Sequence, residues 1–279
     1  MSKKKQRRFE IIVTVIAVIF LVLAFVPILT MLLLSFKSNA QIYGDFFSLP
    51  HPVQWSNYNT AIGMLIPNMI NSLLVVAIAT IITAVLSALG GYVFAQMRFP
   101  GKNVLFLMIL ALMMVPGVLT LTPQYALIQD LKLYNTWWAL IFPWVSGGQV
   151  FGIYLCRTFM ENIPKELFES AKMDGCTELK AMTRIAVPLS KSILATVVVM
   201  KMIDYYNDFI WPLMSVESNS KQVITVAIRV LQSAAGATGN ADLGSLTAGF
   251  VFATIPLFIL FIFTSRLYME GLTSGAVKG

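Results

Sequence analysis

Charged side chains are scarce in this sequence. Asp, Glu, Lys and Arg make up 12% of its 279 residues, whereas a typical water-soluble domain carries about 25%. So few charges cannot cover a water-facing surface, and the composition therefore argues against a soluble enzyme. The 57% share of hydrophobic residues also excludes an intrinsically disordered chain.

The sequence is equally poor in residues that bind metals or carry out catalysis. It has one histidine and two cysteines, Cys156 and Cys176, which are too few for a metal site. No phosphate-binding loop of the form GxxxxGK[ST] occurs, so any ATPase that drives this protein is a separate polypeptide. We therefore expect no catalytic residue, no metal and no cofactor bound by this chain.

Long apolar runs, by contrast, are abundant. There are six, each of 19–24 residues, and a helix needs about 20 apolar residues to cross the hydrocarbon core of a bilayer. The gaps between them are shorter than the roughly 50 residues of an independent domain. The sequence therefore predicts an all-α membrane protein with six transmembrane helices in a single domain, 1–279. The runs cover 11–34, 73–95, 104–122, 137–155, 193–214 and 246–265.

Positive charge predicts the orientation of these helices. Fifteen Lys and Arg residues fall in the segments on the side of the two termini, and four fall in the segments on the other side. Because positively charged loops stay in the cytoplasm, we expect both termini there. The net charge of +7 then follows from topology and does not indicate nucleic-acid binding. The first run could also be a signal peptide, but its 24 residues exceed the usual 7–15 and favour an uncleaved helix.

Two features inside the predicted helices concern packing. Small residues recur every four positions in the second run and form a smooth face, for packing either within the chain or with another subunit. The glycine pair at 147–148 predicts an interruption of the fourth helix, either as a packing kink or as part of a cavity wall. The small residues are Thr83, Ser87, Gly91 and Ala95.

The segment 161–188 is more polar and more patterned than a simple connector. Pro164 suits the first turn of a helix, where a missing N–H is harmless, and Gly175 suits the end of that helix. A second short helix is expected from about 177 to 187. The segment therefore predicts two short helices at the membrane surface, joined at Gly175.

This segment resembles the EAA loop of ABC importer permeases, whose pattern is EAA-x3-G-x9-I-x-LP. The chain departs from the pattern only with Ser170 and Val187, both small changes. Two further strings, 207–212 and 271–279, are similar to segments of the MalG-like branch of carbohydrate permeases, and the resemblance covers nearly the whole chain. The retained positions of the pattern are Glu169, Ala171, Gly175, Ile185 and Pro188.

The resemblance implies a type I ABC importer permease of a bacterial inner membrane. Its loop would be a coupling helix seated in a groove of an ATPase subunit, and the ATP and Mg²⁺ would be bound by two such separate subunits. The other partners would be a second, homologous permease, an extracellular solute-binding protein and membrane lipid. The substrate would be a di- or oligosaccharide, or alternatively a glycerol phosphate. The expected coupling residues are Leu167, Phe168, Glu169, Ala171, Asp174 and Gly175.

The fifth predicted helix carries charges, which are costly inside a membrane. Lys201, Asp204 and Asp208 share one helical face, so they either face a water-filled pathway or neutralise each other between helices. Nearby amide and aromatic side chains suit a sugar, which needs hydrogen bonds for its hydroxyls and a flat surface for its C–H face. The predicted pathway residues are Tyr205, Asn207, Asp208 and Trp211.

The last nine residues, 271–279, show no apolar stripe and on that ground would form a disordered end. The resemblance implies instead that this tail reaches between the ATPase subunits. The expected contact residues are Thr273, Ser274, Gly275 and Lys278.

An ion-coupled secondary transporter is the alternative reading of six membrane helices. It would need titratable groups paired in the middle of the membrane, and only Lys201, Asp204 and Asp208 qualify. It would also leave the patterned segment 161–188 without a role. The sequence therefore favours the ABC permease.

Overall fold

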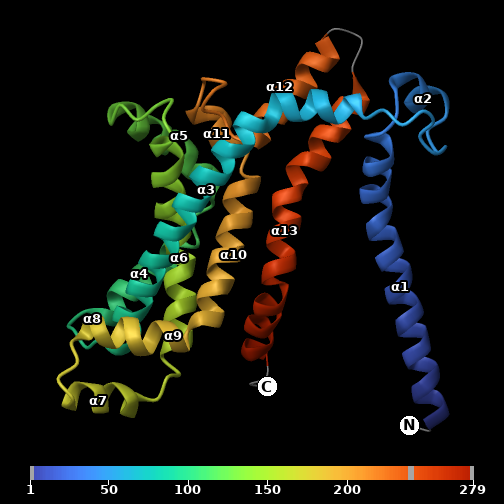
Figure 1. The fold of residues 1–279 in the computed structure, drawn as a ribbon. Helices are drawn as coiled ribbons and strands as arrows, with labels where there is room; N and C mark the ends of the chain where they lie inside the picture. Colours follow the sequence, from blue (N-terminus) through green and yellow to red (C-terminus); the bar gives the residue numbers. More distant parts are fainter. Residues whose placement is uncertain (1–2, 238–241, 277–279) are drawn as a thin grey trace. The chain divides into compact units, whose positions relative to one another are not determined.

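The computed structural model describes residues 3–237 and 242–276, and every regular element in those two ranges is helical (Figure 1). The prediction of an all-α protein is thereby confirmed. The elements are α1 (Lys3–Leu34), α2 (Asn39–Gly44), α3 (Ser56–Gln96), α4 (Lys102–Leu112), α5 (Gly117–Asp130), α6 (Trp138–Met160), α7 (Lys165–Met173), α8 (Glu178–Ala181), the π-helical turn η1 (Met182–Ala186), α9 (Val187–Leu189), α10 (Lys191–Asn207), α11 (Ile210–Ser215), α12 (Ile224–Ala237) and α13 (Leu243–Ala276).

Four helices, α1, α3, α6 and α13, are each long and apolar enough to cross a membrane. Two bent helix pairs raise the number of spans to six if each pair counts as one. The first pair is α4 with α5, and the second is the segment Glu178–Leu189 with α10. The fold class expected from the apolar runs is therefore confirmed for the described residues. These four helices are longer than the corresponding runs: α3 already begins at Ser56, although its apolar run begins at residue 73.

The described chain forms two compact units. One consists of Met1–Ile66 and Ile228–Ile255, and the other of Pro67–Ala227 and Pro256–Gly279. The second unit contains α4 to α11 and most of α3. All residues predicted for coupling and for the substrate pathway lie in it, so the contacts described below are contacts within this unit.

We expected the third apolar run, 104–122, to form one straight helix, but it does not. It is divided into α4 and α5, whose axes differ in direction by 97°. Pro116 stands directly before α5 with an extended backbone, at φ −61° and ψ 126°. Proline has no N–H for the helical ladder and disfavours a helical conformation at the preceding residue, which here is Val115. The break therefore follows from one residue that a count of hydrophobicity ignores.

The fifth run, 193–214, is also broken. α10 ends at Asn207, Asp208 is extended at ψ 127°, and α11 begins at Ile210. Pro212 explains the position of the break, because an unbroken helix would require its missing N–H to bond with the Asp208 carbonyl four residues earlier. That carbonyl instead accepts a hydrogen bond from the Thr225 hydroxyl at 2.8 Å.

Ser87 and Gly91 of α3 pack against α6 of the same chain, and Thr83 hydrogen-bonds to Tyr205 of α10, so this face is used for internal packing. A Cβ atom added at Gly91 would collide with the Cβ of Cys156 on α6. A Cβ atom at Gly152 on α6 would collide with the Ser87 hydroxyl on α3. Each helix thus provides a glycine where the other approaches most closely. The predicted interruption at 147–148 is wrong, because α6 continues through it to Met160.

Candidate functional site

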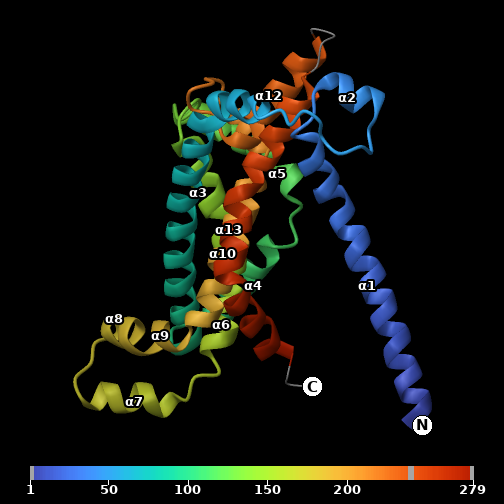
Figure 2. The same ribbon diagram turned by 45° about the vertical axis from the view of Figure 1, so that its right-hand side comes forward.

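The patterned segment forms two short helices, α7 and α8, at the end of the unit where α3 and α6 terminate (Figures 1 and 2). Pro164 stands immediately before α7. Gly175 follows the helix at φ +74°, a left-handed conformation that side chains with a Cβ atom rarely adopt. Its N–H bonds to the Lys172 carbonyl at 3.1 Å, and the next N–H bonds to the Ala171 carbonyl at 2.9 Å. These are the two bonds of a Schellman cap, so Gly175 ends α7 as the sequence predicts.

The two sides of α7 have different surroundings. Phe168 and Ala171 are half-buried and lie on the side that faces the bundle. Glu169 and Asp174 are exposed, as is Leu167, whose exposed fraction is 45%. These three residues therefore lie on a surface that a partner protein can reach.

Phe168 does not point outward, as an apolar anchor for a partner would. It packs against the bundle, and its ring centroid lies 6.1 Å from that of Tyr92 on α3. The most exposed apolar residue of α7 is Met173, which is 88% exposed, compared with 45% for Leu167. The sequence could have indicated that Met173 is exposed, because it lies one helical turn after the charged Glu169 and so shares its face. The buried cluster under Phe168 consists of Tyr92, Cys156, Met160, Ile163, Met182, Ala186 and Val197.

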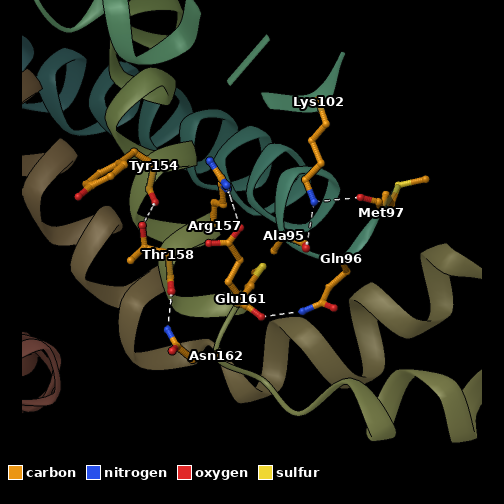
Figure 3. A network of polar contacts seen from close by, with 10 residues as sticks. Ala95, Gln96, Met97, Lys102, Tyr154, Arg157, Thr158, Glu161 and Asn162 are labelled. Atoms are coloured by element: carbon orange, nitrogen blue, oxygen red, sulfur yellow. Dashed lines mark hydrogen bonds and ion pairs between the residues drawn. The ribbon is translucent and has the colours of Figure 1, made fainter. Parts of the chain in front are cut away.

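A polar network fixes the neighbouring ends of α3, α4 and α6 (Figure 3). The Lys102 ammonium at the start of α4 donates to the Ala95 and Met97 carbonyls, at 3.2 and 3.0 Å. The Gln96 amide donates to the Met160 carbonyl at 2.6 Å. Lysine at the end of a helix satisfies carbonyls that have no partner within it. The ends of α3, α4 and α6 next to α7 and α8 are thus held together by hydrogen bonds as well as by apolar packing.

Three of the four predicted pathway residues have hydrogen-bond partners on another helix, α6. Asp208 accepts a hydrogen bond from the Trp144 indole at 2.7 Å, and the Trp211 indole donates to the Ala139 carbonyl at 2.8 Å. Tyr205 is buried and donates to the Trp144 carbonyl at 2.7 Å. These three side chains join α6 to the broken end of α10, so their polar groups already serve the fold.

Asn207 differs from these three residues. Its side chain is exposed, and its amide donates to the Ile203 carbonyl of its own helix at 2.9 Å. Lys201 and Asp204 form an ion pair at 2.8 Å, which agrees with mutual neutralisation rather than with two free charges. A role in the substrate pathway stays a prediction for all four residues, and Asn207 is the one whose side chain is most accessible.

A cavity of about 800 Å³ opens where α4 and α5 bend around α6. Its wall is mostly apolar, with a few polar groups. Gly147 lines this cavity, and a Cβ atom added to it would meet nothing within 4 Å. A cavity wall was one of two interpretations of the glycine pair at 147–148 in the sequence, and Gly147 does line this cavity. The break at Pro116, on which the cavity depends, was not predicted. Other lining residues are Thr120, Gln124, Phe142, Ser146 and Val150.

The predicted tail lies mostly outside what the structure describes. The backbone of α13 is helical as far as Ala276, which includes Thr273, Ser274 and Gly275. Their side chains, and the whole of Lys278, lie outside the described residues. Their contact with ATPase subunits stays a prediction.

The fold and the loop can be compared with known proteins. The family model of the "binding-protein-dependent transport system inner membrane component" matches residues 87–272, which include α7 and α8. The chain belongs to this family. It is therefore the permease of an ABC transporter, a membrane subunit without catalytic activity of its own, and it crosses the membrane several times.

Several relatives match this permease over most of its length. A probable ABC transporter permease of Bacillus subtilis, YurM, is 31% identical and covers 97% of this chain and 89% of its own. The trehalose transport permease SugB of Mycobacterium tuberculosis is 32% identical over 92% of this chain and 93% of its own. The arabinooligosaccharide permease AraQ of Halalkalibacterium halodurans is 29% identical over 99% and 100%.

A solved structure supports the fold of the permease. A chain from the crystal structure of a bacterial ABC transporter for import of the polysaccharide alginate superposes with a TM-score of 0.83. It is 22% identical and covers 95% of this chain and 98% of its own. At that identity the similarity shows the fold alone, and the fold agrees with the type I importer permease expected from the sequence.

Proposed function

We propose that this permease forms half of the membrane pathway of an importer for a di- or oligosaccharide. The relatives with named substrates include permeases for trehalose, arabinooligosaccharides and diacetylchitobiose, which supports a sugar of this size. The second half of the pathway would be a homologous permease, and an extracellular solute-binding protein would deliver the sugar.

The observation that carries this proposal is the two-sided structure of α7. Its inner side packs on Tyr92 through Phe168, while its outer side presents Leu167, Glu169 and Met173 to solvent. An exposed face that combines apolar and acidic groups on a short, capped helix suits a protein groove better than an anionic lipid surface. This face would be the seat of one of two ATPase subunits, which would bind the ATP and Mg²⁺.

The same assignment orients the chain in a bacterial inner membrane. ATPase subunits work in the cytoplasm, so α7 and α8 lie on the cytoplasmic side. We expect the chain termini on that side too, because fifteen basic residues fall in the segments on the side of the termini. Labelling of a single cysteine placed at residue 173 or 219, from each side of intact vesicles, tests this orientation; position 219 lies in the loop before α12.

The decisive test is uptake by the assembled transporter in proteoliposomes. We expect accumulation of a radiolabelled oligosaccharide that requires ATP and the binding protein and persists when proton and sodium gradients are collapsed. Uptake that follows an ion gradient without ATP would instead identify a secondary transporter. Screening trehalose, arabinooligosaccharides and a glycerol phosphate in parallel identifies the class of substrate.

A further inference from the structure

Tyr92, near the end of α3, contacts both α7 and α8, the two short helices of the segment 161–188. Its ring packs on Phe168 of α7, with centroids 6.1 Å apart and planes inclined by 57°. Its hydroxyl donates a hydrogen bond to the Glu178 carboxylate of α8 at 2.8 Å. The side chain is only 3% exposed, so a single buried residue of the membrane bundle meets α7 and α8 together.

The connection between α7 and α8 does not by itself fix their relative position. The turn passes through Gly175, which lies in open space with nothing within 4 Å of an added Cβ atom. α8 begins at Glu178 behind the cap residue Thr177 and is four residues long. Two short helices joined by an exposed glycine turn need an external contact to move together, and Tyr92 provides one to each of them.

Tyr92 is itself held firmly in the bundle. The adjacent Gly91 lies where α3 and α6 approach most closely, because a Cβ atom there would collide with Cys156. Four residues after Tyr92, the Gln96 amide bonds to the Met160 carbonyl of α6 at 2.6 Å. A displacement of the Tyr92 side chain is therefore a displacement of α3 and α6.

We propose that Tyr92 is the positioning residue that transmits movement of α7 and α8 to the membrane helices, with Glu178 as its partner. This inference rests on the proposed function, in which α7 is seated on an ATPase subunit. Glu178 lies outside the EAA pattern, which spans Glu169 to Gly175 and continues only at Ile185. The hydroxyl carries the directional part of the contact, because a hydrogen bond to a carboxylate is stronger and more sharply oriented than packing of two rings.

The test compares Tyr92→Phe and Glu178→Gln with unaltered protein, each in the complete transporter reconstituted in proteoliposomes. Tyr92→Phe keeps the ring contact and removes only the hydroxyl. Glu178→Gln keeps the size of an exposed side chain and removes its charge, so it folds even if the tyrosine variant does not. We expect sugar taken up per ATP hydrolysed to fall about tenfold in Tyr92→Phe, in the range for loss of one hydrogen bond to a charged group. The fall in Glu178→Gln should be smaller but measurable, because its amide oxygen still accepts a weaker, neutral hydrogen bond.

The chain offers a matched control in a second tyrosine–glutamate pair. The Tyr134 hydroxyl donates to the Glu217 carboxylate at 3.4 Å, in loops at the opposite end of the same unit from α7 (Figures 1 and 2). Tyr134→Phe and Glu217→Gln make the same chemical changes there. We expect uptake per ATP hydrolysed to stay unchanged in both control variants.

Two further measurements separate transmission from simple loosening of the structure. The double variant Tyr92→Phe/Glu178→Gln should lose no more coupling than Tyr92→Phe alone, because once the hydroxyl donor is gone the side chain at 178 has no contact with residue 92 left to lose. Hydrogen exchange of the α7 and α8 amides should become several times faster in the Tyr92 and Glu178 variants and stay unchanged in the controls, while the melting temperature of the complex stays the same.

The outcomes distinguish this inference from the proposed function. Normal uptake per ATP in Glu178→Gln, or equal losses in the Tyr134 and Glu217 controls, overturns the role of Tyr92 and leaves the importer intact. If the unaltered complex shows no ATP-dependent sugar uptake, the proposed function fails first. Faster exchange and lost coupling confined to the Tyr92 and Glu178 variants support the inference.

Discussion

The Tyr205 ring lies flat on the Trp144 indole, with centroids 5.3 Å apart and planes only 7° apart. The Tyr205 hydroxyl bonds to the Trp144 carbonyl, and the Trp144 indole N–H bonds to Asp208. Gly148, one turn further along α6, leaves the space that the Tyr205 hydroxyl occupies. The contact between α6 and α10 is therefore closely packed and fully hydrogen-bonded at this point, and it should tolerate substitution poorly.

Gly148→Ala should lower the free energy of unfolding by about 1–3 kcal/mol, because the new methyl group collides with the Tyr205 hydroxyl. The measurement is thermal unfolding of the purified protein in detergent. Gly147→Ala is the matched control: its methyl group meets nothing within 4 Å, and alanine favours a helix over glycine by up to about 1 kcal/mol. Adding Tyr205→Phe to Gly148→Ala should restore part of the loss. Equal melting temperatures for the two alanine variants would contradict this account of the packing.

The two faces of α7 should respond differently to substitution. Met173→Asp places a charge on the exposed face and should lower ATP-driven uptake about tenfold without changing the melting temperature, since docking loses roughly 1.4 kcal/mol. Phe168→Ala removes a ring packed on the bundle and should lower the melting temperature. If Met173→Asp transports normally, the exposed face of α7 is not the ATPase contact.

Alanine substitutions at Asp208 and Asn207 should distinguish a residue that stabilises the fold from one that can line the substrate pathway. Asp208→Ala leaves the Trp144 indole N–H without its partner and should destabilise the protein by about 1–3 kcal/mol. Asn207→Ala removes an exposed amide bonded only to its own helix, so stability should change by less than about 0.5 kcal/mol. A fall in uptake by stable Asn207→Ala would support a pathway role, and unchanged uptake would remove Asn207 from the pathway.

Deleting residues 273–279 should lower coupled ATP hydrolysis and transport while the amount of assembled complex stays the same. The reason is that the tail is expected to reach between the ATPase subunits, whereas it adds no apolar stripe to a core. Quantifying the purified complex alongside its ATPase activity checks both halves of the prediction. Full coupled activity in the truncated transporter would show that the tail has no such role.

The sequence predicted the first short helix of segment 161–188 well because its signals are local. Pro164 and Gly175 mark the limits of α7 by their own backbone preferences, whatever the rest of the chain does. The apolar runs located the spans for a similar reason, since a span depends on length and hydrophobicity alone. The breaks near Pro116 and Asp208 were missed because an average over a run hides the effect of one proline.

The contacts within the site could not be predicted from the sequence. Tyr92 and Glu178 are 86 residues apart, and Trp144 and Asp208 are 64 apart, so only the packing of α3, α6 and α10 brings each pair together. Phe168 was predicted as a coupling residue for the same reason: nothing in the sequence showed that its ring packs on the chain's own bundle.

The break between α4 and α5 has a consequence for the environment in which this chain can exist. Each helix end leaves backbone groups without a partner in its own ladder, and hydrocarbon offers such groups nothing in exchange. Met114 and Val118, around the break, expose 84% and 73% of their side chains, so the described part of this chain does little to cover the region. Lipid tails are therefore a poor solvent for this stretch of the chain. Water in the adjoining cavity, or another polypeptide, has to provide the hydrogen-bond partners that these backbone groups do not find in the bilayer.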